Sequence, residues 1–187
     1  MKIYYEEKSN FKLEYNDNLN IKIRKIDEEA LTYSHCMKNV DFIIDLDSIN
    51  ILIFLEIKNY KKLFNDLKTE QEKEDFFSNF NYSKPNNKES YSYDFIQKAR
   101  DTFIREYSSN KIDNKKIHYY IIINIPDNSE SRLITMEKEL KNNLPLLEKI
   151  DDKLYIKPFI HTCNIFYSNT WNECLKDKTG IEVSFYD

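Results

Sequence analysis

Hydrophobic and polar residues alternate through the first part of the chain, as they do in half-buried β-strands. Apolar side chains recur at every second position in three runs, at residues 3–5, 11–15 and 21–23. Asn16-Asp17-Asn18 is a turn sequence between the second and third runs. The pattern predicts short strands between Lys2 and Ile26. The polar segment from Asp27 to Met37 is expected to form one or two helical turns.

Two nearly continuous apolar runs follow. They are VDFIIDLD, from Val40 to Asp47, and ILIFLEIK, from Ile51 to Lys58. Runs of this length and composition indicate strands that are covered on both faces. The tight turn Asp47-Ser48-Ile49-Asn50 joins them, so they are expected to pair as an antiparallel hairpin. If Asp47 lies opposite Asn50, the same register brings Asp41 directly opposite Glu56.

The rest of the chain alternates between helical and strand patterns. Helices are expected over Tyr60–Phe80, Tyr91–Tyr107, Ser131–Leu144 and Trp171–Leu175, and strands over Ile117–Ile125, within Leu154–Phe166 and over Ile181–Tyr186. Asn79 to Ser90 reads as a loop. This order predicts an α/β fold in which helices flank a central mixed β-sheet. Without a linker rich in Pro, Gly or Ser, one domain over residues 1–187 is the simplest organisation.

Composition excludes several classes of protein. A single glycine in 187 residues leaves no Gly-rich phosphate-binding loop. Cys36, Cys163 and Cys174 form no CxxC pair, so they are interpreted as reduced thiols rather than zinc ligands. The chain has no apolar run that could span a membrane and no secretory signal at its start, which predicts a cytoplasmic protein. A net charge of −4 excludes a uniformly basic DNA-coating protein but not a local basic surface.

Three charged side chains share one face at one end of the predicted hairpin. Residues two apart in a strand point the same way, so Lys58 lies on the face of Glu56, and Asp41 faces both across the strand pair. Directly opposed residues have Cβ atoms about 5 Å apart, and two like charges there are destabilising. A divalent cation such as Mg²⁺, or Mn²⁺, would remove that repulsion. Asp45 shares the face and is a second candidate ligand, nearer the turn.

This arrangement resembles the PD-(D/E)XK nuclease superfamily, whose fold is that of restriction endonucleases. In that superfamily an Asp begins one strand of a hairpin, and an acid-any-Lys triplet lies near the end of the next. The matching residues are Asp41 and the triplet Glu56-Ile57-Lys58. The resemblance implies that Asp41 and Glu56 are catalytic metal ligands, that the Ile57 carbonyl is a further ligand, and that Lys58 is the catalytic lysine.

The resemblance also implies contributions from neighbouring helices. Glu28 or Glu29 would supply a carboxylate from a preceding helix, and Gln97 or Lys98 a polar group from a following one. The triplet alone carries little weight, because Glu6-Glu7-Lys8 also fits it. The partner aspartate and the register of the hairpin are what distinguish Glu56-Ile57-Lys58. The ordinary alternative is a solvated hairpin end with no chemistry.

The predicted function is therefore that of a Mg²⁺-dependent endonuclease that hydrolyses phosphodiester bonds, with DNA expected before RNA. Two alternatives stay open: an RNA-directed nuclease, and a catalytically inactive module of the same fold that binds nucleic acid or protein. Further lysines and arginines could contact a phosphate backbone; they are Lys61, Lys62, Lys68, Lys98, Arg100 and Arg105. So small a chain is compatible with a homodimer or with a place in a larger system.

Overall fold

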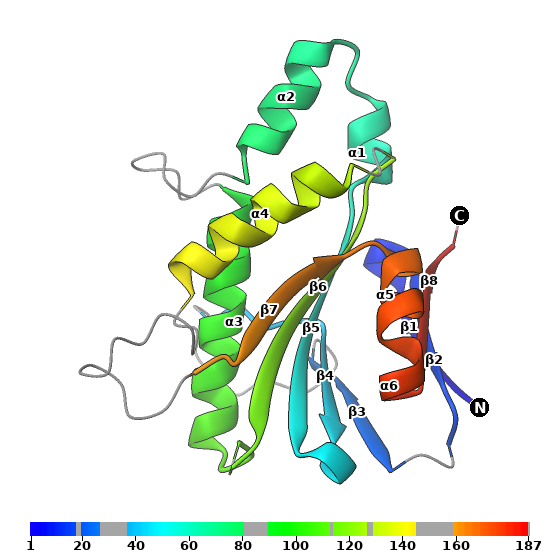
Figure 1. Ribbon diagram of the computed structural model, residues 1–187, viewed down its shortest axis with the longest axis vertical. Helices are drawn as coiled ribbons and strands as arrows, with labels where there is room; N and C mark the ends of the chain where they lie inside the picture. Colours follow the sequence, from blue (N-terminus) through cyan, green and yellow to red (C-terminus); the bar gives the residue numbers. More distant parts are fainter. Residues whose placement is uncertain are drawn as a thin grey trace.

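The computed structural model describes residues 1–17, 20–26, 37–80, 90–112, 114–126, 129–144 and 159–186. Within them, a five-stranded mixed sheet has the strand order β3-β4-β5-β6-β7 (Figure 1). Its strands are β3 (Ile21–Lys25), β4 (Phe42–Leu46), β5 (Ile51–Asn59), β6 (Lys116–Asn124) and β7 (Thr162–Phe166). The first three are antiparallel neighbours, and β5, β6 and β7 run parallel. The α/β fold with a central mixed sheet flanked by helices is confirmed.

The hairpin of β4 and β5 has the register that the turn predicts. Phe42 pairs with Leu55 and Asp45 with Leu52. The connection is a 3-10 turn, Asp47–Ile49, and Asn50 after it takes the left-handed conformation with φ 57°. Asparagine tolerates that conformation better than most residues, so the sequence of the turn fixes the pairing.

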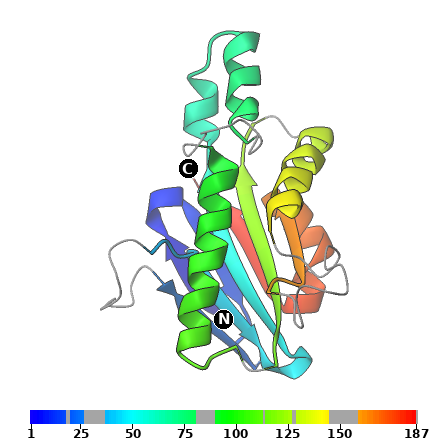
Figure 2. The ribbon, with the colours of Figure 1, turned by 90° about the vertical axis from the view of Figure 1, so that its left-hand side faces the viewer.

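Two long helices cover one face of the five-stranded sheet (Figure 2). They are α3 (Tyr91–Ser108), which lies in the crossover from β5 to β6, and α4 (Glu130–Asn143), which lies between β6 and β7. Alternate residues of the central strands, such as Ile43, Phe54 and Tyr119, are buried beneath these helices. The strands present their other residues to the opposite face, as a period of two requires.

A second sheet covers the opposite face, and the sequence did not predict this arrangement. It has the order β1-β2-β8, with β1 at Lys2–Glu6, β2 at Phe11–Tyr15 and β8 at Ile181–Phe185. The helices α5 (Ser168–Cys174) and α6 (Lys176–Thr179) precede β8. Trp171 is fully buried in the core on this side, and its indole N–H donates to the Ile181 carbonyl at 3.1 Å. Pairing between β2 and β8, far apart in sequence, leaves no local signal in either strand.

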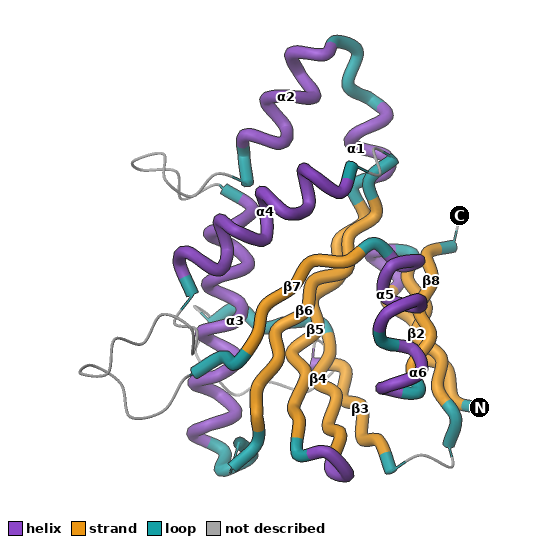
Figure 3. The backbone as a smooth tube through the Cα atoms, viewed as in Figure 1, coloured by secondary structure: helices purple, strands orange, loops and turns teal. Residues whose placement is uncertain are grey.

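The segment expected to form one helix over Tyr60–Phe80 forms two, α1 (Lys61–Asn65) and α2 (Glu70–Ser78). They extend beyond the end of the five-stranded sheet, as the backbone trace shows (Figure 3). Thr69 caps α2 with a capping box to Glu72, which explains why a new helix begins there. Within the described residues, no helix is long and apolar enough to cross a membrane.

Some predictions fall on residues that the structure does not describe. These are most of the turns expected over Asp27–Met37, most of the loop from Asn79 to Ser90, and the first part of the strand region Leu154–Phe166. The other expected elements are present with boundaries close to those predicted.

Candidate active site

Asp41 and Glu56 meet at the end of the hairpin that is remote from the turn. Asp41 immediately precedes β4, and its backbone carbonyl accepts a hydrogen bond from the Ile26 N–H at 3.0 Å, on the β3 side. Its side chain turns the other way, and Oδ2 accepts from the Ile57 N–H of β5 at 2.7 Å. The Asp41 carboxylate therefore replaces a missing strand partner at the point where β4 begins.

Helix α3 brings Lys98 to this pair of carboxylates. Its Nζ lies 2.6 Å from Glu56 Oε1 and 3.7 Å from Asp41 Oδ1. Two oxygens this close to one nitrogen are also close to each other, so the structure brings the two predicted ligands together. Of the two helix candidates, Lys98 is the one that reaches them. Among the described residues, Gln97 makes no hydrogen bond to either carboxylate.

Lys58 completes the group, as its position two residues after Glu56 predicts. Its Nζ lies 3.0 Å from Glu56 Oε1 and 4.0 Å from Asp94 Oδ2. Sequence reasoning missed Asp94, although it stands one helical turn before Lys98 on α3 and shares its face. Asp94 also binds Lys38 at 2.7 Å, so it links the segment before β4 to the helix.

Burial sets the electrostatics of this site. Glu56 is completely buried, and Asp41 is 8% exposed. Burial, and then the charge of Glu56, raise the pKa of Asp41 to about 8, against the opposing effects of Lys98, the Ile57 N–H and Lys58. Burial alone would lower the pKa of Lys98, but Glu56 and Asp41 together raise it above its ordinary value. Two buried carboxylates thus compete for a limited amount of positive charge.

One oxygen of the Glu56 carboxylate, Oε2, is buried and has no hydrogen-bond partner among the described residues. A buried charged oxygen without a partner is costly, and a cation would satisfy it. The Ile57 N–H points toward Asp41, and in a strand the carbonyl of the same residue points to the same edge. Asp41, Glu56 and the Ile57 carbonyl therefore fit a small divalent cation.

The donor set favours a metal that keeps several water ligands. Within the described residues, no group of three or more His, Cys, Asp or Glu side chains could hold a metal ion. Two carboxylates and one carbonyl are few for Ca²⁺, and the set holds none of the His or Cys ligands typical of Zn²⁺. Mg²⁺ usually binds proteins through one or two carboxylates and retains water.

The other candidates lie elsewhere. Asp45 is at the turn end of the hairpin, where it forms an ion pair with Lys115, so it does not join Asp41 and Glu56. Glu28 and Glu29 are outside the described residues, as is Cys36. Cys163 is buried, with its pKa raised by burial, and Cys174 is an exposed thiol. His118, which is not among those candidates, is half-buried, and burial lowers its pKa to about 4.

No protein-family model matches this sequence, and neither a curated protein nor a solved structure matches the chain.

Proposed function

We propose that the protein is a metal-dependent nuclease that hydrolyses phosphodiester bonds in nucleic acid, with DNA as the expected substrate. The observation that carries the proposal is the buried pair Asp41 and Glu56, in which two lysines contact Oε1 of Glu56 and Oε2 has no partner among the described residues. Burying two carboxylates side by side is costly, and a bound cation would add to the compensation that the two lysines supply.

The position of the pair in the fold supports the resemblance to the PD-(D/E)XK superfamily. Asp41 stands at the start of one strand of a hairpin, and Glu56-Ile57-Lys58 lies near the end of the next. These are the positions that the resemblance implies. Helix α3 then crosses to a strand parallel to β5 and packs over the face that carries the charged residues.

Each side chain has a distinct part in this proposal. Asp41 and Glu56, with the Ile57 carbonyl, would hold the ion. The ion, when bound, polarises the scissile phosphate and lowers the pKa of a water ligand. Lys58 is the more exposed of the two lysines, at 28% of its side chain, and would orient the attacking water or balance charge on the phosphate. Lys98 is more deeply buried and would hold Glu56 in place.

The test is cleavage of a mixed panel of DNA and RNA with Mg²⁺ or Mn²⁺. We expect metal-dependent cutting by the wild type and none by Lys58→Ala or Glu56→Gln. Asp45→Asn is the matched control, because it removes a carboxylate from the same sheet face at the other end of the hairpin. Cutting by Glu56→Gln at the wild-type rate would contradict the proposal, and the panel would separate DNA from RNA substrates.

A second candidate is a binding module for nucleic acid that does not hydrolyse it. It is favoured by one observation: both lysines contact the same oxygen, Glu56 Oε1, so ammonium groups already balance part of the acidic charge. This candidate predicts oligonucleotide binding that is insensitive to divalent ions and tolerates Glu56→Gln. The nuclease proposal predicts the opposite on both points.

A further inference from the structure

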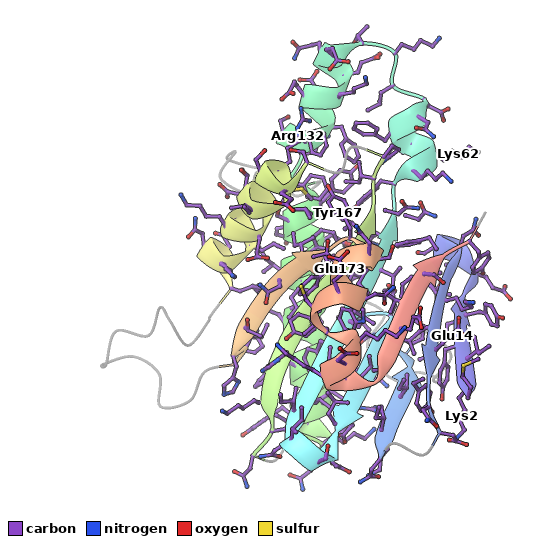
Figure 4. All side chains as sticks on the ribbon, turned by 45° about the vertical axis from the view of Figure 1, so that its right-hand side comes forward. Lys2, Glu14, Lys62, Arg132, Tyr167 and Glu173 are labelled. Atoms are coloured by element: carbon purple, nitrogen blue, oxygen red, sulfur yellow. The ribbon has the colours of Figure 1, made fainter. Side chains whose placement is uncertain are left out.

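An open pocket of about 660 Å³ lies where β5 ends, on the face of the sheet opposite the candidate active site. Its lining includes Lys8 from the turn after β1, Lys61 and Lys62 from α1, and Tyr186 after β8. Figure 4 shows Lys62 projecting from α1 on the side where β8 ends. Segments from both ends of the chain and from its middle thus meet in one pocket.

The described residues that line the pocket carry more positive than negative charge. Among them are three lysines and one carboxylate, that of Asp66, in a chain whose net charge is −4. The remaining lining residues include asparagines, which donate amide N–H groups. Ammonium groups, amides and a phenol that converge on a concave surface are the groups with which proteins bind phosphate oxygens.

Asn59 holds the rim of the pocket in place. Its Nδ2 donates to the Ser9 carbonyl at 2.9 Å, which joins β5 to the turn that carries Lys8. Its Oδ1 accepts from the Lys61 N–H at 3.1 Å and from the Asn124 side chain at 3.2 Å. The Asn59 side chain therefore fixes the turn that carries Lys8 relative to the start of α1, which carries Lys61 and Lys62. The lysines of the pocket are held together by hydrogen bonds of the fold.

The pocket and the candidate active site lie on opposite faces of the sheet but at the same end of β5. In the described structure β4 pairs with β5 only as far as Leu55, so the β4-side edge of β5 continues past its partner. Lys58 faces α3 there, and Asn59, the next residue, faces the pocket. Lys61 is three positions after Lys58, which limits the distance between their Cα atoms to about 10 Å. That span equals about three nucleotides of one strand at roughly 3.4 Å each.

We infer that this pocket binds a backbone phosphate of the nucleic acid strand, within about three nucleotides of the phosphate that the active site would attack. The inference rests on the proposed function. Lys8, Lys61 and Lys62 supply the positive charge, and a strand that crosses the end of β5 contacts both faces of the sheet. Because backbone phosphates are common to all sequences, the pocket contributes affinity and position without base preference.

The first experiment measures binding of labelled DNA and RNA oligonucleotides by fluorescence anisotropy, in Ca²⁺ and again in EDTA, over a series of salt concentrations. The test variant combines Lys8→Gln, Lys61→Gln and Lys62→Gln. The control combines Lys111→Gln, Lys138→Gln and Lys178→Gln, three exposed lysines outside the pocket, so the change in net charge is the same.

We expect the pocket variant to bind about tenfold or more weakly at 0.1 M salt. The slope of log affinity against log salt should become shallower by about one, since each lost phosphate contact removes about 0.9. The control should stay near the wild type. Equal losses in the two triple variants would overturn the inference, as would a wild type that binds neither DNA nor RNA.

Asp66→Asn gives an independent test that does not depend on loss of function. Asp66 is exposed at the end of α1, so its replacement should leave the fold intact. Removing the carboxylate from the pocket should tighten oligonucleotide binding a few-fold and steepen its salt dependence. Unchanged or weaker oligonucleotide binding would contradict the inference that the pocket binds a phosphate.

Failure of this inference can be told apart from failure of the proposed function. If binding depends on the pocket lysines but the protein cuts nothing with Mg²⁺ or Mn²⁺, the pocket binds phosphate and the nuclease proposal is wrong. If the wild type and the pocket variant both cut in a metal-dependent way with the same KM, the nuclease proposal stands and the inference about the pocket is wrong.

Discussion

The two ends of the β4–β5 hairpin carry similar residues in opposite electrostatic states. At the turn end, Lys115 binds Asp45, and Lys115 and Lys22 bind Asp47 at 2.5 and 2.8 Å. Hydrogen bonds from these lysines hold the pKa of Asp47 well below its ordinary value. At the other end, burial and the charge of Glu56 raise the pKa of Asp41 to about 8.

Burial is what separates the two ends. Asp47 is exposed, so water and lysines share the solvation of its charge, whereas Glu56 is completely buried beneath α3. An acidic side chain next to a lysine does not by itself make a reactive site. Water solvates both charges of an exposed pair, and the pair contributes little to stability. A buried pair that leaves one carboxylate oxygen without a hydrogen-bond partner, as Glu56 does, has a reason to bind a cation. Four predictions test this contrast, from the largest expected effect to the smallest.

The largest effect should be on cleavage. Glu56→Gln and Lys58→Ala should each reduce the rate about 10³-fold or more, because they remove charge that stabilises the transition state. Asp45→Asn and Asp47→Asn, at the turn end, should cut like the wild type. Initial rates on whichever DNA or RNA the wild type cuts provide the measurement. A similar loss of cleavage rate in variants at both ends of the hairpin would contradict the proposal that only the buried end is the active site.

Metal binding should differ between the two ends even in the absence of substrate. We expect Mn²⁺ to bind the wild type in a calorimetric titration, and Glu56→Gln to weaken that binding by about 10–100-fold or more, since loss of a supporting residue already costs that much. Asp45→Asn should bind as the wild type does. A wild type and a Glu56→Gln variant with the same affinity would place the metal elsewhere.

Stability should depend on pH with opposite sign at the two ends. An unfolded aspartate loses its proton near pH 3.9, but folded Asp41 keeps it to about pH 8. Between these values the folded state binds more protons, so Asp41 lowers stability as pH rises. Asp47 has a lowered pKa and does the reverse: its stabilising contribution is present at neutral pH and is lost as pH falls below its unfolded pKa.

Urea denaturation between pH 5 and pH 8 measures the Asp41 effect. Asp41→Asn should be more stable than the wild type at pH 8, by a few kcal/mol at most, and the advantage should shrink toward pH 5. Asparagine can still accept the hydrogen bond from the Ile57 N–H. Mg²⁺ should reduce the difference at pH 8, since it binds the deprotonated carboxylate. A constant difference across the range would contradict the raised pKa.

The smallest effect concerns the turn that sets the register. Asn50→Ala should destabilise the fold by about 1–2 kcal/mol, because alanine resists the left-handed conformation. Asn50→Gly should cost less, since it loses only the 2.8 Å hydrogen bond from Nδ2 to the Asn114 carbonyl. Thermal unfolding of both variants measures the difference. Metal binding should survive in both if the register holds.

Much of the candidate site was predictable from local sequence. The turn Asp47–Asn50 sets the pairing, the pairing places Asp41 opposite Glu56, and the strand period places Lys58 beside Glu56. Lys98 was one of two helix candidates, and only the rotation of α3 about its axis selected it over Gln97. Asp94 and the pocket at the end of β5 were missed because each needs packing between segments that are distant in the sequence.

The sequence by itself determined the strands, the long helices, and the register and faces of the central hairpin, because these follow from hydrophobic period and turn chemistry over a few residues. The tertiary structure decided what local patterns do not contain. It placed β2 against β8 as a second sheet, buried Glu56 beneath α3 and raised the pKa of Asp41. Burial and charge competition are sums over residues brought together by the whole fold, so no single stretch of sequence records them.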